Sequence, residues 1–226
     1  MDIMKKPLAV CLFSGGLDSS TTLYCAIQDG FTPLALTMDY GQLHRREIDS
    51  AKRIASHLGI EHQVLSIRLP WGGSALIDPK IPIPEYRDVV GSSNEIPVTY
   101  VPARNTIFLS FAASFAEARG AQAIYIGANA LDYSGYPDCR PEYFDAFEKM
   151  IQLGTKAGVE GRAISIQAPL LKMSKMEIIL LAQRLGVPLE QTWSCYRGGA
   201  RPCGTCDSCK LRAKGFAEAG VLDPAL

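Results

Sequence analysis

The chain has 226 residues, of which 47% are hydrophobic and 20% are charged. This composition indicates a well-folded protein with one substantial core, and it excludes a disordered chain. The 23 basic residues balance the 23 acidic residues, so the basic surplus typical of proteins that bind long nucleic acids is absent. We therefore expect small-molecule partners and no nucleic acid, and a homodimer is left open.

The sequence has no apolar stretch long enough to span a membrane, and residues 1–7 show no signal-peptide pattern. We expect no membrane partner and a cytoplasmic location.

Short apolar runs alternate with helix-length segments along most of the chain. Strands are predicted at Leu8–Phe13, Pro33–Met38, His62–Ile67, Ala123–Gly127 and Ile164–Ile166. Helices are predicted at Ser19–Gln28, Arg45–Leu58, Asn105–Ala118, Glu142–Leu153 and Ser174–Leu185, followed by Gly30, Gly59, Gly120 or Gly186 at four of their ends. This alternation predicts an α/β fold with a mostly parallel sheet and helices on both faces. Ligands of such sheets bind at the carboxyl ends of the strands.

A cluster of small and polar residues, Phe13-Ser14-Gly15-Gly16-Leu17-Asp18-Ser19-Ser20, follows the first predicted strand. Glycines let a backbone approach a phosphate closely, and hydroxyls and free N–H groups at a helix start donate to it. No Gly-Lys-Ser/Thr follows, which excludes a Walker A loop, and the Gly-x-Gly-x-x-Gly spacing of a dinucleotide site is missing. The cluster predicts a site for nucleotide phosphates, with an ordinary turn as the alternative. The expected contacts are Phe13, Ser14, Gly15, Gly16, Leu17, Asp18, Ser19, Ser20, Thr21, Thr22 and Leu23.

Two stretches interrupt the alternation. The proline-rich segment Leu69–Val98 is interpreted as an inserted loop beside the site. From Thr192 onward the chain becomes a cysteine-bearing module. We therefore expect one α/β domain at 1–191 and a small metal-binding module at 192–226, packed on the same domain.

Four cysteines, Cys195, Cys203, Cys206 and Cys209, gather near the end of the chain, three of them as C-x-x-C-x-x-C. Four thiolates can close a tetrahedral Zn²⁺ site, and a closed site has no position for water, so its role would be structural. An iron–sulfur cluster is the first alternative, and free thiols or a redox pair come next. We expect structural zinc.

Further polar residues follow the second and fourth predicted strands, on the expected ligand-binding edge. Tyr40 and Gln42 lie after the second strand, and Arg104 begins a helix where it could bind phosphate. The densest polar segment, residues 127–142, suggests substrate recognition. Its candidate contacts are Asn129, Asp132, Tyr133, Asp138 and Arg140. Cys139 could be a nucleophile or could simply pack.

Read together, the motifs Y-G-Q-x-H-R-R-E, Y-V-P-A-R-N, D-Y-S-G-Y-P-D-C-R-P-E and S-C-Y…P-C-G-x-C-D-S-C-x-L-R occur in order along residues 8–212. The chain resembles the 7-cyano-7-deazaguanine synthase (QueC) family, a branch of the PP-loop ATP pyrophosphatases. The resemblance implies an adenine nucleotide alpha hydrolase-like fold. It also implies an AMP-forming ligase that turns 7-carboxy-7-deazaguanine and ammonia into 7-cyano-7-deazaguanine, a queuosine precursor, through an adenylated carboxylate and an amide.

The resemblance also suggests roles for individual residues. Asp18 and Ser19 belong to the family's ATP loop, and Arg104 and Lys172 are candidates to neutralise charge at the α-phosphate. Mg²⁺ is expected with ATP. The alternatives are another PP-loop enzyme that thiolates or amidates tRNA, or a non-catalytic zinc-ribbon binding module on a degenerate nucleotide-binding scaffold.

Overall fold

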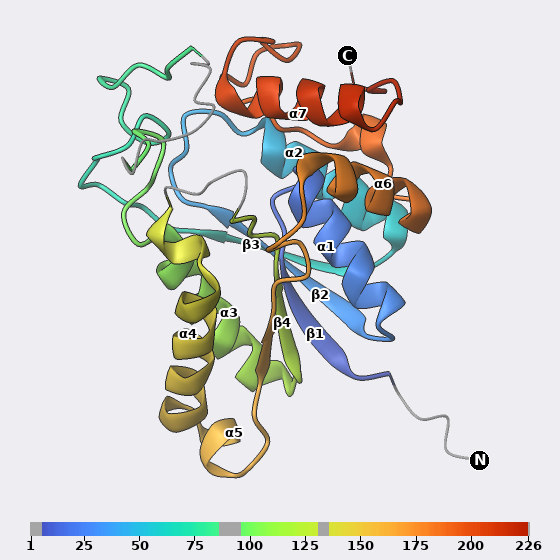
Figure 1. Cartoon of the computed structure of the whole chain (residues 1–226). Helices are drawn as coiled ribbons and strands as arrows, with labels where there is room; N and C mark the ends of the chain where they lie inside the picture. The colour runs from blue at the N-terminus through green and yellow to red at the C-terminus, as the bar shows by residue number, and fades with distance from the viewer. Residues whose placement is uncertain (1–5, 86–95, 131–135, 226) are drawn as a thin grey trace.

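Five parallel strands form the central sheet of the protein (Figure 1), whose computed structural model describes residues 6–85, 96–130 and 136–225. The strands are β1 (Leu8–Leu12), β2 (Thr32–Asp39), β3 (Glu61–Ser66), β4 (Ala123–Ile126) and β5 (Ser165–Gln167). No strand boundary differs by more than one residue from its predicted position. The order is β3-β2-β1-β4-β5, so the chain moves to the other side of β1 after β3. The switch point lies between β1 and β4, where such sheets bind their ligands.

Helices cover both faces of the sheet, as predicted (Figure 1). Helices α3 (Arg104–Arg119), α4 (Pro141–Gly154) and α5 (Lys156–Val159) lie on one side. On the other side lie α1 (Leu17–Gln28), α2 (Arg46–Leu58), α6 (Lys175–Leu185) and α7 (Asp207–Glu218). Short 3₁₀ turns occupy Pro137–Cys139 and Leu189–Gln191. Helix α7 was not predicted, because the cysteines led us to interpret this part of the sequence only as a metal-binding module.

The buried core has two layers, one on each face of the sheet, and β1 shows how the sequence supplies both. Val10 and Leu12 pack into the layer under α3 and α4, whereas Ala9, Cys11 and Phe13 pack into the layer under α1 and α6. Successive side chains of a strand point to opposite faces, so a strand buried on both sides is apolar throughout.

The C-terminal segment packs against the same helices that hold the first strand. Phe216 of α7 is only 2% exposed within the core layer of α1 and α6. A side chain at Gly215 would collide with Lys175 and lie 2.9 Å from Ile179 Cδ1, so α7 and α6 approach closely there. Arg212 forms a buried ion pair with Asp223, with N–O distances of 2.6 and 2.9 Å. The end of the chain is therefore held against α6 by packing, and the ion pair joins α7 to the residues that follow it.

The interruption at Leu69–Val98 has no helix or strand in its described parts, 69–85 and 96–98. Gly59, Gly120 and Gly186 end α2, α3 and α6 in the left-handed conformation, as predicted for helix-ending glycines. Within the described ranges, no helix combines the length and apolar character needed to cross a membrane.

Candidate active site

A cavity of about 230 Å³ opens at the carboxyl edge of the sheet. Its lining comes from the residues that follow β1, β2 and β4, from the first turns of α1, α2, α3 and α6, and from the C-terminal segment. The loops after the first, second and fourth strands therefore share one site, as the parallel topology predicts.

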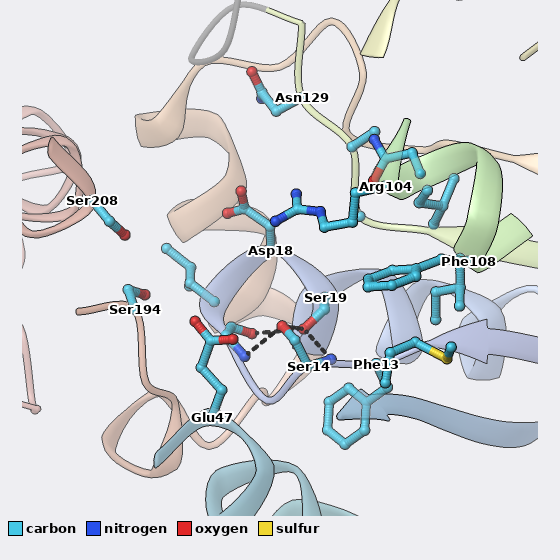
Figure 2. A pocket seen from close by; sticks show the side chains of 18 of the residues that line it. Phe13, Ser14, Asp18, Ser19, Glu47, Arg104, Phe108, Asn129, Ser194 and Ser208 are labelled. Carbon is cyan, nitrogen blue, oxygen red and sulfur yellow. Dashed lines mark hydrogen bonds between the residues drawn. The ribbon is translucent and has the colours of Figure 1, made fainter. Parts of the chain in front are cut away.

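The loop after β1 is organised by its own serines. Ser14 Oγ lies 3.0 Å from Ser19 Oγ, and the Ser14 N–H donates to Ser19 Oγ at 3.2 Å (Figure 2). The Ser19 hydroxyl also contacts the Gly16 carbonyl at 3.2 Å. Helix α1 begins at Leu17, two residues earlier than predicted. Its first N–H groups therefore lie beside the serines, in the arrangement that binds phosphate.

Glycines let this loop fit between its neighbours. A Cβ at Gly15 would meet the backbone nitrogen of Ala51 and lie 2.6 Å from the carbonyl oxygen of Glu47, and Gly15 has φ of +82°. A Cβ at Gly127, which follows β4, would lie 3.0 Å from the backbone of Ser19. Any larger residue at either position would push the loop away from α2 or from β4.

Asp18 and Lys175 form an ion pair on the cavity wall. Lys175 Nζ donates to both carboxylate oxygens of Asp18, at 2.8 and 2.9 Å. The Ser174 side chain caps α6 and the Glu177 side chain bonds back to the Ser174 N–H, so Lys175 is fixed at the first position of the helix. The Ser-x-x-Glu spacing was the signal that could have identified Lys175. Lys172, the lysine predicted from the sequence, is exposed and does not line the cavity.

Arg104 lines the cavity between two aromatic rings. Its guanidinium carbon lies 6.0 Å from the centre of the Tyr40 ring and 5.9 Å from that of Phe108. Arg104 is the first residue of α3, and Ala103 before it has a φ of +53°, which is unusual for a residue with a side chain. The helix start and the rings together direct the guanidinium into the cavity (Figure 2).

Glu47, in the first turn of α2, is a second charged group of the lining that the sequence had not singled out. Burial raises the pKa of its carboxyl to about 7, although the positive charge of Arg104 lowers it in part. The first turn of a helix is usually solvated, and the sequence of this turn gave no sign that Glu47 would face a cavity.

The other predicted contacts are divided between the cavity and its surroundings. Phe13, Leu17, Tyr40, Gln42 and Asn129 line the cavity. The amides of Gln42 and Asn129 are used internally: Gln42 Oε1 accepts from the Tyr40 N–H at 2.9 Å, and Asn129 Nδ2 donates to the carbonyls of Leu170 and Met173. Ser20, Thr21, Thr22 and Leu23 are fully buried in α1 and do not line the cavity.

The polar segment 127–142 lies partly away from the cavity. Asp138 accepts the N–H of Asn105 at the start of α3, at 3.1 Å, and Arg140 is exposed and donates to the Pro137 carbonyl. Both line a separate shallow hollow. Cys139 does line the main cavity, and burial raises the pKa of its thiol to about 11. Asp132 and Tyr133 lie outside the described residues.

The C-terminal segment supplies a wall of its own, which the sequence had not indicated. We call Trp193, Ser194, Tyr196, Ser208, Leu211 and Arg212, all of which line the cavity, the C-terminal wall. The Trp193 N–H donates to the Gly15 carbonyl at 3.0 Å. Arg212 donates to Thr192 Oγ1 at 2.8 Å and to Ser194 Oγ at 3.3 Å. This wall therefore contacts the loop after β1 directly.

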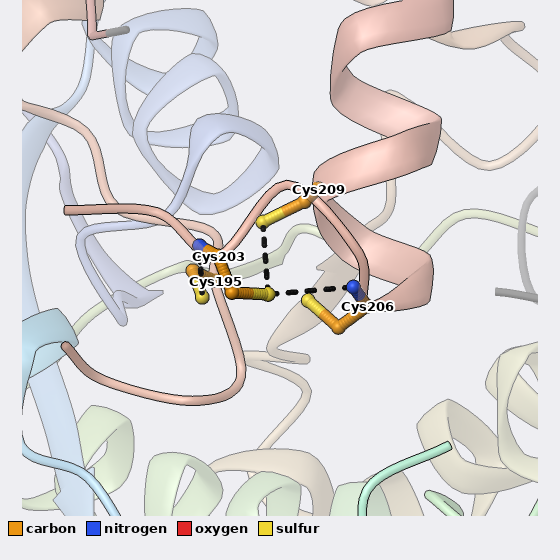
Figure 3. Close-up of side chains that lie close together, drawn as sticks. All are labelled: Cys195, Cys203, Cys206 and Cys209. Atoms are coloured by element: carbon orange, nitrogen blue, oxygen red, sulfur yellow. Dashed lines mark hydrogen bonds between the residues drawn. The ribbon is translucent and has the colours of Figure 1, made fainter. Parts of the chain in front are cut away.

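The four C-terminal cysteines converge beside this wall (Figure 3). Their sulfur atoms all lie within 4.8 Å of one another, and those of Cys203 and Cys209 are 3.9 Å apart. Thiolates bound at about 2.3 Å around one tetrahedral ion are about 3.8 Å apart. Backbone N–H groups point at two of the sulfurs: Arg197 and Cys203 donate to Cys195, and Thr205 and Cys206 donate to Cys203. The cluster can hold a metal ion.

Comparison with known proteins identifies the family of the chain. The model of the family described as queuosine biosynthesis protein QueC matches residues 8–220. A 7-cyano-7-deazaguanine synthase of Trichodesmium erythraeum is 59% identical over 96% of this chain and 99% of its own length. One of Nostoc sp. is 57% identical over 96% of this chain and 95% of its own length. The chain belongs to the QueC family.

A solved U34-tRNA thiolase of Methanococcus maripaludis, with its [4Fe-4S] cluster, also resembles the chain. It is 19% identical, with a TM-score of 0.47, over 96% of this chain and 67% of that one. A likeness of this degree says nothing about which metal the four cysteines hold here.

Proposed function

We propose that this protein is an ATP-dependent, AMP-forming ligase that converts 7-carboxy-7-deazaguanine and ammonia to 7-cyano-7-deazaguanine. The observation that carries the proposal is the loop of Ser14 and Ser19, which opens into the same cavity as Arg104 and the Asp18–Lys175 pair. A phosphate cradle faced by cations suits transfer of AMP to a carboxylate, because negative charge builds up at the α-phosphate.

The roles of the cavity residues follow from their charges. The hydroxyls of Ser14 and Ser19 and the N-terminus of α1 would bind the phosphates of ATP. Arg104 and Lys175 would stabilise the charge that develops during adenylation, and the exposure of Lys172 favours Lys175 for this role. Asp18 would orient Lys175 through their ion pair. Mg²⁺ bound with ATP would neutralise further phosphate charge.

The deazaguanine ring would pack against aromatic side chains. Tyr40 and Phe108 meet edge to face, with ring centres 5.2 Å apart, on the cavity wall beside Arg104. Direct hydrogen bonds from Asp132, Tyr133, Asp138 and Arg140 to the ring or its carboxylate stay predictions from the sequence. The side-chain amides of Gln42 and Asn129 already form hydrogen bonds within the protein, which supports a role for these two residues in shaping the pocket.

We propose Zn²⁺ as the ion at the four cysteines. The mutual spacing of the sulfurs supports one tetrahedral ion, because an iron–sulfur cluster binds each thiolate to an iron at a different corner and so needs wider spacing. The division of the chain at residue 191, a cytoplasmic location, the absence of a nucleic-acid partner and a homodimer stay predictions from the sequence.

One assay tests the proposal. The protein is incubated with ATP, Mg²⁺, ammonium and 7-carboxy-7-deazaguanine, and the nucleotide and base products are identified by chromatography and mass. We expect two AMP for each nitrile formed, since the carboxylate and then the amide are adenylated. Formation of ADP, or no consumption of the carboxylate, would overturn the proposed function.

A further inference from the structure

Amide formation requires ammonia, whereas amines of this basicity are mainly protonated in neutral solution. Under the proposed function, the cavity must therefore attract ammonium and remove a proton from it. The two cations on the wall opposite, Arg104 and Lys175, repel ammonium. An ammonium site needs hydrogen-bond acceptors and a carboxylate that is not already held in an ion pair.

Glu47 provides that charge. Its carboxylate lines the cavity, and within the described part of the chain it makes no hydrogen bond and no ion pair. The other carboxylate in the described lining, that of Asp18, is paired with Lys175. A partly buried carboxylate without a partner is costly unless a ligand provides one. A cation that donates hydrogen bonds suits this position.

Two hydroxyls complete the site. Ser208, in the first turn of α7, is only 9% exposed and lines the cavity, yet its hydroxyl bonds to none of the residues that the structure describes. Ser194 is held in place by the hydrogen bond from Arg212. Figure 2 shows Glu47, Ser194 and Ser208 on one side of the cavity, opposite Arg104 and Phe108, with their oxygen atoms turned inward.

We propose that Glu47, with the hydroxyls of Ser194 and Ser208, forms the site that receives ammonium and takes the proton that converts it to ammonia. The inference rests on the proposed function and adds the source of its nitrogen. The N–H groups of ammonium donate to the three side chains, and the negative charge of Glu47 excludes anions from this end of the cavity.

Glu47 takes one proton from ammonium, and the freed lone pair forms a C–N bond to the carbonyl carbon of the adenylated substrate. The carbonyl π electrons move to oxygen and return as the C–O bond to AMP breaks, so AMP leaves with that electron pair. The nitrogen loses its extra proton to water, and Glu47 releases its own proton to solvent. A base that titrates near the working pH is suited to this exchange.

Glu47→Gln tests the proposal, with Asp49→Asn as the matched control. Asp49 is an exposed acid in the same turn of α2, so its substitution removes the same charge away from the cavity. We expect Glu47→Gln to raise the KM for ammonium about 10- to 100-fold, from the value of a hydrogen bond to a charged group. Ser208→Ala should raise this KM about 3- to 10-fold, and Asp49→Asn less than about 2-fold.

Two further measurements separate this role from others. Exchange of pyrophosphate into ATP, driven by 7-carboxy-7-deazaguanine without ammonium, should be unchanged in Glu47→Gln because it needs no nitrogen. Hydroxylamine is uncharged at pH 7, so hydroxamate formation should fall far less than amide formation. Loss of exchange in Glu47→Gln would overturn the proposal and assign Glu47 to ATP. An unchanged KM for ammonium would overturn it too, whereas absence of exchange in the unsubstituted protein would instead refute the proposed function.

The pH dependence gives a third check. The groups that face Glu47 are Arg104 and Tyr40, together with the paired Asp18 and Lys175. Because burial raises the pKa of Glu47 to about 7, its charge is lost as the pH falls through 7. The protonation of ammonia affects both proteins equally. The ratio of amide formation by the unsubstituted protein to that by Glu47→Gln should therefore fall towards one below pH 7, and a constant ratio contradicts the role.

Discussion

The two walls of the cavity hold their side chains by different means. Where the loop after β1 forms the wall, the serines bond within a few residues of one another, and Gly15 and Gly127 fit against neighbouring backbone. In the C-terminal wall, Ser194 depends on Arg212, which in turn depends on Asp223 and Thr192. The side-chain positions in the loop after β1 are determined by the backbone of the parallel sheet and its neighbouring helices. Those in the C-terminal wall depend on the folding of the end of the chain.

This difference has a functional consequence. In our proposals the loop and its facing cations handle ATP, and the C-terminal wall with Glu47 handles ammonium. The walls meet at the hydrogen bond from the Trp193 N–H to the Gly15 carbonyl. Loss of the Asp18 carboxylate should therefore remove chemistry from a stable protein, whereas loss of a cysteine beside the C-terminal wall should reduce stability and ATP binding together.

The largest effect is expected from Asp18→Ala. This substitution removes the carboxylate that accepts from Lys175 Nζ on the cavity wall. We expect AMP formation to fall by at least about 1,000-fold, the scale seen when a preorganised electrostatic group is lost. Any metal content, measured by elemental analysis, should stay unchanged because the cysteines lie beside the other wall, away from this ion pair. Retained turnover would contradict the assignment of this loop.

Cys206→Ser should destabilise the protein through the C-terminal wall. Losing one of four ligands weakens metal binding and frees the segment that carries Trp193 and Ser194. We expect a loss of about 3 kcal/mol, which lowers Tm by about 6–12 °C in a chain of this size. Calorimetry measures Tm, and titration measures ATP affinity, which should weaken as well. Removal of the metal by a chelator should produce the same two changes.

If the Cys206 variant loses metal but keeps its affinity for ATP, the two walls are independent. That outcome would leave the hydrogen bond between Trp193 and Gly15 as a contact without influence on the site.

Short-range patterns account for what the sequence predicted well. The strands are apolar runs bounded by turns, the loop of Ser14, Asp18 and Ser19 is one uninterrupted motif, and the four cysteines lie close together in sequence. Each depends on neighbours along the chain, so each could be recognised without knowledge of packing.

Residues that reach the cavity from distant elements were missed for the opposite reason. Asp18 and Lys175 are 157 positions apart in sequence, and no local pattern joins them. Glu47 and Ser208 belong to first turns of helices that would usually be solvated. Arg140 shows the limit of local composition: a dense polar segment suggested ligand contacts, yet this side chain is exposed and lies outside the main cavity, so its contact with the substrate stays a prediction.

A pair of glycine substitutions compares the loop after β1 with the cysteine segment beside the C-terminal wall. Gly15 and Gly204 both have positive φ, of +82° and +71°, but only Gly15 has backbone atoms of α2 where a Cβ would stand. Both alanine variants carry the strain of a left-handed backbone. We expect Gly15→Ala to cost about 2 kcal/mol more than Gly204→Ala, because it also overpacks a tight contact. Denaturant unfolding measures both, and equal losses would mean that the loop is free to move away from α2.

The smallest effect is expected from Cys139→Ser. Cys139 lines the cavity, so a nucleophilic role is the alternative that this variant examines. Burial raises the pKa of its thiol to about 11, and Asn105 Nδ2 lies 3.3 Å from the sulfur. Because the pKa is raised, the thiol is neutral at pH 7 and becomes a thiolate only as the pH approaches 11. A neutral thiol is a poor nucleophile. We expect AMP and nitrile formation to change less than about 3-fold, with no ionisation of a thiol in the pH profile between 6 and 9. A loss of about 100-fold in a variant that keeps its Tm would instead make Cys139 a covalent participant: its sulfur would take the acyl group from the adenylate, with release of AMP, to form a thioester that ammonia then attacks.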